Sequence, residues 1–147
     1  MMIYMDVCCF NRPFDDQTQD RIRIESDAVL AILSKCLSGE WQLLSSEVLD
    51  IEIENTNDEW RKSKVYELYK LTEEKIILND KIIKRAYDIQ NSGIKSFDSL
   101  HLASAEYVKA DVFLTTDKNL LRAAGRLKLD IATANPLNWF MEVDENE

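Results

Sequence analysis

Two adjoining segments decide the fold: Ser96-Phe97-Asp98-Ser99-Leu100-His101-Leu102-Ala103-Ser104-Ala105 and Val112-Phe113-Leu114-Thr115-Thr116-Asp117. The first places an acid at the start of an expected helix, and the second places another acid directly after a short apolar strand. A third acid, Asp6, follows the apolar opening of the chain. Acids that follow the strands of an open α/β sheet meet at one edge, because such sheets form their ligand sites at the carboxyl ends of strands. Converging carboxylates without bases beside them predict a hard divalent metal.

The composition predicts one globular domain. The chain has 147 residues, of which 46% are hydrophobic and 31% charged, and this suits a single core. No apolar run reaches the ~18 residues of a membrane span, and the opening residues carry neither a basic region nor a long apolar region of a signal peptide. We therefore expect a single domain over 1–141, an acidic tail over 142–147, no membrane contact and a cytoplasmic location.

Charge and cysteine usage narrow the kind of site. The three cysteines (Cys8, Cys9 and Cys36) are an odd number with no zinc-type spacing, and His101 is the single histidine. These counts argue against a disulfide framework and against a Cys/His zinc site. The formal net charge is -9, which is unusual for a nucleic-acid binder. A bound cation would invert the local field around clustered carboxylates and so remove this objection.

Strands and helices alternate along the chain. Strands are expected at 2–6, 41–44, 75–78, 112–114 and 130–132. Helices are expected at 17–37, around 48–53, and at 58–72, 81–91, 97–108 and 118–127, with a loop at 7–16 and a final helical turn at 136–141. This alternation predicts an α/β fold in which helices cover both faces of a parallel sheet. We expect a three-layer α/β/α arrangement with about five central strands.

Each acid also has an ordinary structural explanation. Asp6 could be a turn residue, Asp98 could interact with a helix dipole, and Asp117 could cap the helix that follows it. Three acids at one sheet edge nevertheless favour a site. A fourth acid should come from the helix after the second strand. Glu52, which lies between two isoleucines at the edge of the buried face, is the favoured candidate, and Glu47 remains an alternative.

Clustered carboxylates need a cation for a physical reason. Carboxylates in one cleft raise one another's pKa, and a divalent ion removes that penalty. Mg²⁺ or Mn²⁺ binds a few carboxylates and retains waters, and it can assist displacement at a phosphodiester. Thr115, beside the last acid, could hydrogen-bond a carboxylate or a phosphate oxygen, although it is equally well explained as a β-branched strand residue.

At these residues the chain resembles the PIN-domain family of metal-dependent ribonucleases, which includes the VapC-type toxins of toxin–antitoxin pairs. The matching pieces occur in family order: Ile3-Tyr4-Met5-Asp6, the helix with Glu52, Asp98-Ser99-Leu100-His101-Leu102-Ala103 and Leu114-Thr115-Thr116-Asp117. The resemblance implies an Mg²⁺ or Mn²⁺ site, cleavage of single-stranded RNA, and frequent homodimers. By resemblance, the metal-binding and catalytic acids are Asp6, Glu52, Asp98 and Asp117.

One departure from the family concerns the residues after Asp6. Many members have polar residues there, whereas this chain has Val7-Cys8-Cys9. Asn11 and Arg12, further along the same segment, are candidates for the missing polar contacts to RNA. His101, one turn after Asp98, could act as a general base, although a partly buried structural histidine is the commoner case.

Three other interpretations concern function and partners. The acidic surplus suggests a basic partner, which in a toxin pair would be a small antitoxin whose arginine or lysine enters the acidic cleft. A PIN-like module that binds RNA or protein with little catalysis is the main alternative to a nuclease. A receiver-like phosphoacceptor domain ranks lower, because the paired acids and the late lysine that it needs are not in place.

Overall fold

The computed structural model describes residues 1–145, and its centre is a parallel sheet. Its four strands are β1 (Met2–Met5), β2 (Gln42–Leu43), β5 (Val112–Leu114) and β6 (Ala132–Ala134), in the order β2-β1-β5-β6. Tyr4 on β1 is in register with Phe113 on β5. Because all four strands run the same way, their carboxyl ends share one edge, and Asp6 and Thr115 follow two of these ends directly.

A second, two-stranded parallel sheet holds β3 (Ser45–Ser46) and β4 (Lys75–Ile76). The strand expected at 41–44 therefore divides between two sheets. The backbone partners explain the division, because the Leu44 amide donates to Ile3 while the next amide, of Ser45, donates to Glu74. The expected sheet of about five strands is thus a sheet of four, and the strand expected at 75–78 pairs outside it.

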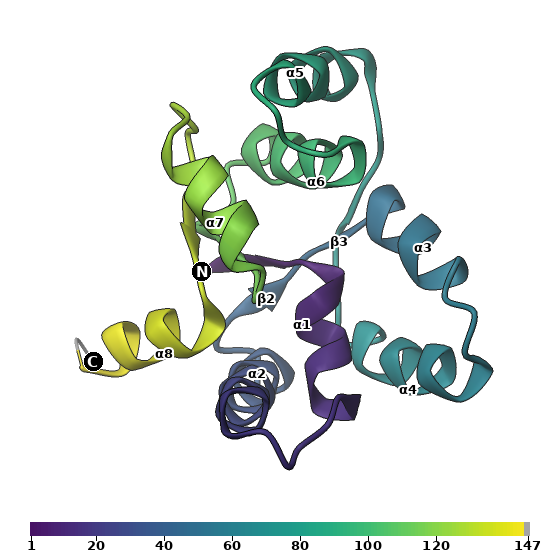
Figure 1. The fold of residues 1–147 in the computed structure, drawn as a ribbon, viewed down its shortest axis with the longest axis vertical. Helices are drawn as coiled ribbons and strands as arrows, with labels where there is room; N and C mark the ends of the chain where they lie inside the picture. Colours follow the sequence, from purple (N-terminus) through teal and green to yellow (C-terminus); the bar gives the residue numbers. More distant parts are fainter. Residues whose placement is uncertain (146–147) are drawn as a thin grey trace.

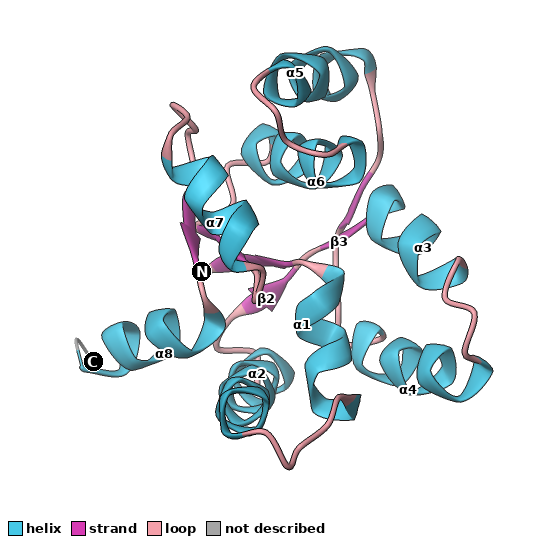
Figure 2. Cartoon of the chain, in the orientation of Figure 1, coloured by secondary structure: helices cyan, strands magenta, loops and turns pink. Residues whose placement is uncertain are grey.

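Helices lie on both sides of the main sheet, as the alternation predicts (Figure 1). Figure 2 shows α5 and α6 on one side and α1 and α2 on the other. The confirmed arrangement is α/β with flanking helices. The helices are α1 (Val7–Asn11), α2 (Asp20–Leu37), α3 (Glu47–Glu54), α4 (Glu59–Tyr69), α5 (Asp80–Asn91), α6 (Ser96–Tyr107), α7 (Lys118–Gly125) and α8 (Pro136–Glu145), with a 3-10 helix η1 (Arg12–Phe14).

The prediction of a loop at 7–16 is wrong, because this segment contains α1 and η1. Asp6 starts α1 by accepting a hydrogen bond from the Val7 amide at 2.8 Å, and Cys9 and Phe10 bury its inner face. A five-residue helix is too short to show a helical repeat of apolar residues, so the sequence alone gives little sign of it.

The C-terminal helix is longer than the expected turn. Helix α8 runs through Glu145, so part of the segment 142–147 continues this helix, and residues 146–147 lie outside the described part of the chain. Trp139 anchors α8 by packing edge-to-face on Trp41, with ring centroids 5.1 Å apart. No helix within residues 1–145 combines the length and apolar character needed to span a membrane.

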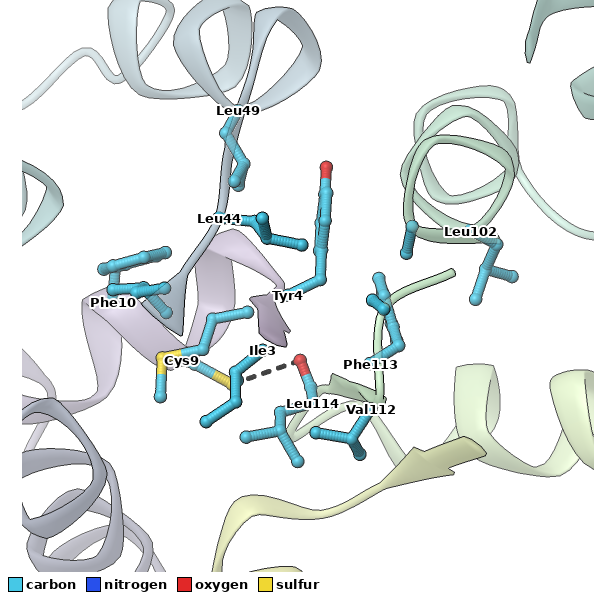
Figure 3. Close-up of a cluster of buried hydrophobic side chains, with 14 of the residues drawn as sticks. Ile3, Tyr4, Cys9, Phe10, Leu44, Leu49, Leu102, Val112, Phe113 and Leu114 are labelled. Carbon is cyan, nitrogen blue, oxygen red and sulfur yellow. Dashed lines mark hydrogen bonds between the residues drawn. The ribbon is translucent and has the colours of Figure 1, made fainter. Parts of the chain in front are cut away.

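The core lies between the central strands and the helices that cover them (Figure 3). Tyr4 and Phe113 stack across β1 and β5 with ring centroids 5.5 Å apart, and both are fully buried. The thiol of Cys9 donates to the Leu114 carbonyl at 3.4 Å, and all three cysteines are free. Burial of large side chains on both central strands, each worth about 2 kcal/mol, fixes the sheet edge on which the acids gather.

Candidate metal centre

Asp6 is held in place by three kinds of contact at the end of β1. One carboxylate oxygen caps α1, and the other accepts a hydrogen bond from the Thr115 hydroxyl at 2.9 Å. The thiol of Cys8 lies 3.5 Å from that second oxygen. Asp6 is only 5% exposed, so its carboxylate has a fixed position and little contact with bulk water.

Glu52 reaches the same place from α3. Its Oε1 contacts Nε2 of His101 on α6, and the same Nε2 lies 3.9 Å from Oδ1 of Asp6. One possible ligand atom from each of these three residues lies within 4.8 Å of the others. The alternative acid, Glu47, instead accepts a hydrogen bond from the Leu78 amide at 2.7 Å. Of the two candidates, Glu52 is therefore the one that the fold brings to Asp6.

Asp98 lies half-buried in the first turn of α6, beside this group. Burial is the largest cause that raises the pKa of Asp98 from its usual 3.8 to about 6, and the negative charge of Asp6 is the next. Asp117 and Glu52 raise this pKa further. The four predicted acids therefore interact electrostatically, although only Asp6 and Glu52 belong to the close group with His101.

Asp117 has the capping role that its sequence position suggests. Its Oδ1 accepts hydrogen bonds from the amides of Asn119 and Leu120 at the start of α7, at 2.9 and 3.1 Å. The residue is exposed, and with Asp98 and Lys95 it lines a pocket of about 160 Å³. Asp117 is thus more exposed to solvent than Asp98.

Thr115 connects two of the acids. Its hydroxyl donates to Asp6 and accepts a hydrogen bond from the Asp117 amide at 3.1 Å. The Cys8 thiol lies 3.3 Å from the same hydroxyl. Because Thr115 is fully buried, its hydroxyl fixes the Asp6 carboxylate and the Asp117 backbone from the interior of the protein. The thiol of Cys8 therefore lies beside both Asp6 and Thr115.

Asn11 and Arg12 are both engaged in contacts within the protein. Asn11 donates to the Val7 carbonyl at 3.0 Å and accepts from Arg61 at 3.1 Å. The Arg12 guanidinium pairs with Glu25 at 2.8 Å and with Asp15 at 3.1 Å. Their polar groups tie α1 and η1 to neighbouring helices in the structure.

Tyr4 and Ser46 belong to this region although the sequence pattern assigns them no role in the site. The Tyr4 hydroxyl lies 2.6 Å from His101 Nδ1 and 2.7 Å from Ser46 Oγ, and all three residues are fully buried. Burial is the main cause that raises the pKa of the Tyr4 phenol well above its ordinary value, so the phenol stays protonated. One sequence signal exists: Tyr4 is two residues before Asp6, which places both on one face of the strand.

The chemistry of these donors fits a hard divalent cation. Asp6, Glu52 and Asp98 offer carboxylate oxygens, the ligands that Mg²⁺ and Mn²⁺ prefer. Burial is the largest cause of the raised pKa of Asp98, and the charges of Asp6, Asp117 and Glu52 raise it further, so part of the shift is repulsion among these carboxylates. A cation bound among them would relieve that repulsion.

Comparison with known proteins gives one family and one fold. The family model described as "PIN domain" matches residues 26–126. Two similar solved structures are VapBC2 from Rickettsia felis bound to a DNA fragment from their promoter, and VapBC-1 from nontypeable Haemophilus influenzae. The first is 13% identical with a TM-score of 0.64, and the second 15% identical with a TM-score of 0.59. Each match covers 92% of this chain and 98% of the other, and at such identity it shows a shared fold. No curated protein sequence matches significantly.

Proposed function

The chain belongs to the PIN-domain family, whose members are generally nucleases, and we propose that it is a Mg²⁺- or Mn²⁺-dependent endoribonuclease. In this proposal it hydrolyses phosphodiester bonds in single-stranded RNA in the cytoplasm. The observation that supports it most is the convergence of Asp6 and Glu52 beside Asp98, whose pKa is raised to about 6. A site built from mutually repelling carboxylates serves a cation better than it serves the stability of the fold.

The acids have different roles in this proposal. Asp6, Glu52 and Asp98 would hold the cation, and a bound Mg²⁺ or Mn²⁺ would supply an activated water and stabilise charge on the phosphodiester oxygens. Thr115 fixes Asp6 through its hydroxyl, at 2.9 Å, so that this carboxylate keeps its orientation. Asp117, exposed at the edge of the pocket, stands where an incoming RNA strand would meet the site.

Lys95 is the candidate contact for the RNA backbone. It lines the same pocket as Asp98 and Asp117 and is exposed. Arg12, a candidate from the sequence, instead pairs with two carboxylates of the protein itself. A chain with a net charge of -9 needs a local positive group to attract phosphate, and Lys95 together with the cation would provide it.

The experiment that tests this function is cleavage of labelled single-stranded RNA with Mn²⁺. Wild type should cleave, EDTA should stop cleavage, and an excess of Mn²⁺ should restore it. Asp98→Asn, which keeps the size of the side chain, should lose cleavage while it remains folded by circular dichroism. Full activity of the Asp98→Asn variant, or unchanged wild-type activity in EDTA, would overturn the proposal.

We also propose a small antitoxin as partner and a homodimer as the assembly. Two structural neighbours are VapBC proteins, and the net charge of -9 favours a basic partner segment. Co-expression with the neighbouring open reading frame should give a complex that purifies together and suppresses RNA cleavage. The mass in solution, measured by light scattering, should be that of a dimer. Failure of the folded chain to bind that product would contradict the antitoxin proposal.

A catalytically weak binding module is the second candidate function. The observation that favours it is the thiol of Cys8, which occupies the position beside Asp6 and Thr115 in place of a polar amide or hydroxyl. Mn²⁺ binding without cleavage of several RNAs, together with RNA or protein binding, would favour this function over the nuclease.

A further inference from the structure

A line of buried polar groups leads from the start of α3 to Glu52. The Leu49 amide donates to Ser46 Oγ at 3.0 Å, and Ser46 Oγ lies 2.7 Å from the Tyr4 hydroxyl. The Tyr4 hydroxyl lies 2.6 Å from Nδ1 of His101, and Nε2 of His101 contacts Glu52. Tyr4, Ser46 and His101 are 0% exposed, so their hydrogen-bonding groups must be satisfied within this line.

The available donors and acceptors fix the direction in which each hydrogen bond of this line is donated. Ser46 Oγ already accepts from Leu49, and within residues 1–145 the acceptor for its own proton is Tyr4. Tyr4 then donates its proton to Nδ1 of His101, which must be unprotonated to accept it. The histidine proton is therefore on Nε2, where it donates to the Glu52 carboxylate.

The opposite tautomer leaves two groups unsatisfied. If Nδ1 carried the proton, Tyr4 would accept it and donate to Ser46, and the Ser46 proton would have no acceptor among the residues described. The lone pair of Nε2 would then face the Glu52 carboxylate. An unpaired buried donor costs about 1–3 kcal/mol, and repulsion between two acceptors adds to that cost.

We propose that His101 is a positioning residue for Glu52 and is not a metal ligand. The proposal rests on the metal-dependent function proposed above. A protonated Nε2 has no lone pair for a cation, although this atom lies within 4.8 Å of possible ligand atoms on Asp6 and Glu52. What Nε2 does instead is orient Glu52, whose side chain is 24% exposed and has a flexible stem. Partners that orient a metal-binding carboxylate raise the affinity of a metal site.

The same line of hydrogen bonds connects the three elements that carry the candidate ligands. Tyr4 lies on β1, Ser46 caps α3, and His101 lies on α6. Because Ser46 caps the same helix that bears Glu52, the position of α3 and the orientation of its carboxylate depend on one hydrogen-bonded line. Asp6 follows Tyr4 by two residues, and Asp98 lies one turn before His101 on α6, so the line sets the relative placement of three candidate ligands.

The tautomer can be measured directly because the chain has one histidine. The full chain, labelled with ¹⁵N-histidine, is observed by long-range ¹H–¹⁵N NMR without metal and then with saturating Mg²⁺. We expect the Nε2–H tautomer in both states. An Nδ1–H tautomer, a doubly protonated ring, or loss of the Nε2 proton on addition of Mg²⁺ would overturn the proposal. The measurement does not use RNA, so its failure is distinct from failure of the nuclease function.

Matched variants test the positioning role by Mn²⁺ affinity, measured from free Mn²⁺ in electron paramagnetic resonance titrations. His101→Leu removes the donor and should weaken Mn²⁺ binding about tenfold, whereas His101→Gln supplies another amide donor and should restore most of the affinity. Tyr4→Phe should also weaken binding, because it frees the ring to change tautomer. A Gln variant as weak as the Leu variant, or unchanged affinity in Tyr4→Phe, would overturn the proposal. If His101→Leu does not fold, the Mn²⁺ affinity of Tyr4→Phe and the NMR spectrum of the wild type still test the proposal.

Discussion

Asp6 combines a structural role with its proposed ligand role. Its amide extends the hydrogen bonding of β1 by donating to Leu114 at 2.9 Å, and its carboxylate caps α1 while it accepts from Thr115. Asp117 likewise caps α7 and lines the pocket with Asp98. In the sequence, capping and site formation are competing explanations of these acids. In the structure the two roles are compatible, since a cap uses one oxygen and leaves the other free for a second contact.

The sequence alone does not decide whether Glu52 or Glu47 belongs to the site. Both acids lie on α3, and their spacing alone does not say which face of that helix meets α6. The structure decides by tertiary contacts, because Glu47 bonds the Leu78 amide and Glu52 bonds His101. The role of Tyr4 and Ser46 is not predictable from the sequence for the same reason: it arises only when three elements meet.

The raised pKa of Asp98 predicts a pH dependence of metal binding. Protons compete with the cation for this carboxylate, whose pKa is raised to about 6. Mn²⁺ affinity should therefore fall about tenfold between about pH 7 and about pH 5, because one proton must be displaced. Calorimetric titration at several pH values measures this slope. Asp98→Asn is the control, and its weaker affinity should vary less with pH.

Stability without metal should change in the opposite sense. Because the folded pKa of Asp98 lies above its usual 3.8, its protonated form favours the fold. This contribution is fully present below about pH 4 and is lost as pH rises through about 6. In EDTA, the unfolding free energy of the wild type should therefore fall relative to that of Asp98→Asn as the pH rises from about 4 to about 7. An equal difference at both pH values would contradict the shift.

Among the secondary-structure elements, helix starts are predictable where a cap is strong. Ser46 caps α3 and Asn79 caps α5, and both are residue types that strongly favour this position. Helix α6 begins at Ser96, and the Lys95 side chain at its cap position makes no capping hydrogen bond. The start of α6 depends on packing against α5, which local sequence does not reveal.

Two matched cap substitutions separate helix stability from the site. Ser46 accepts from the Leu49 amide at 3.0 Å and Asn79 from the Ile82 amide at 2.9 Å. Ser46→Ala and Asn79→Ala should each cost about 1 kcal/mol in unfolding free energy by urea denaturation. Ser46→Ala should also weaken Mn²⁺ binding, since it removes the partner of Tyr4, whereas Asn79→Ala should leave it unchanged. Equal Mn²⁺ affinities of the two variants would contradict the coupling of α3 to Glu52.

For the whole molecule, alternation of strands and helices is enough to predict the layers but not the division of the sheet. The apolar strands β1 and β5 have clear patterns, and they set the sheet edge and the place of the site. The pairing of β3 with β4 involves two residues on each strand, which is too short for a hydrophobic repeat. The change of pairing partner after Leu44 depends on tertiary contacts, so the strand expected at 75–78 lies in the second sheet.

Glu25 links distant segments of the molecule. It is 2% exposed, pairs with Arg12 and Arg21, and accepts a hydrogen bond from Asn135 at 2.5 Å. Glu25→Ala should cost about 3 kcal/mol in unfolding free energy, because it leaves the mostly buried Arg12 without this partner. The control is Glu54→Ala, whose exposed pair with Lys62 should change stability by no more than about 0.5 kcal/mol. Similar losses in both variants would contradict a structural role for Glu25.

In the function that we propose, the acids that converge at one sheet edge form the metal centre of a ribonuclease. Its most direct test is the rate of Mn²⁺-dependent RNA cleavage by Glu52→Gln beside Glu47→Gln, two like substitutions on one helix. Glu52→Gln should slow cleavage about a hundredfold, and Glu47→Gln should stay near the wild-type rate, because its carboxylate bonds the Leu78 amide away from Asp6. Equal rates for the two variants, or a greater loss in Glu47→Gln, would contradict the account.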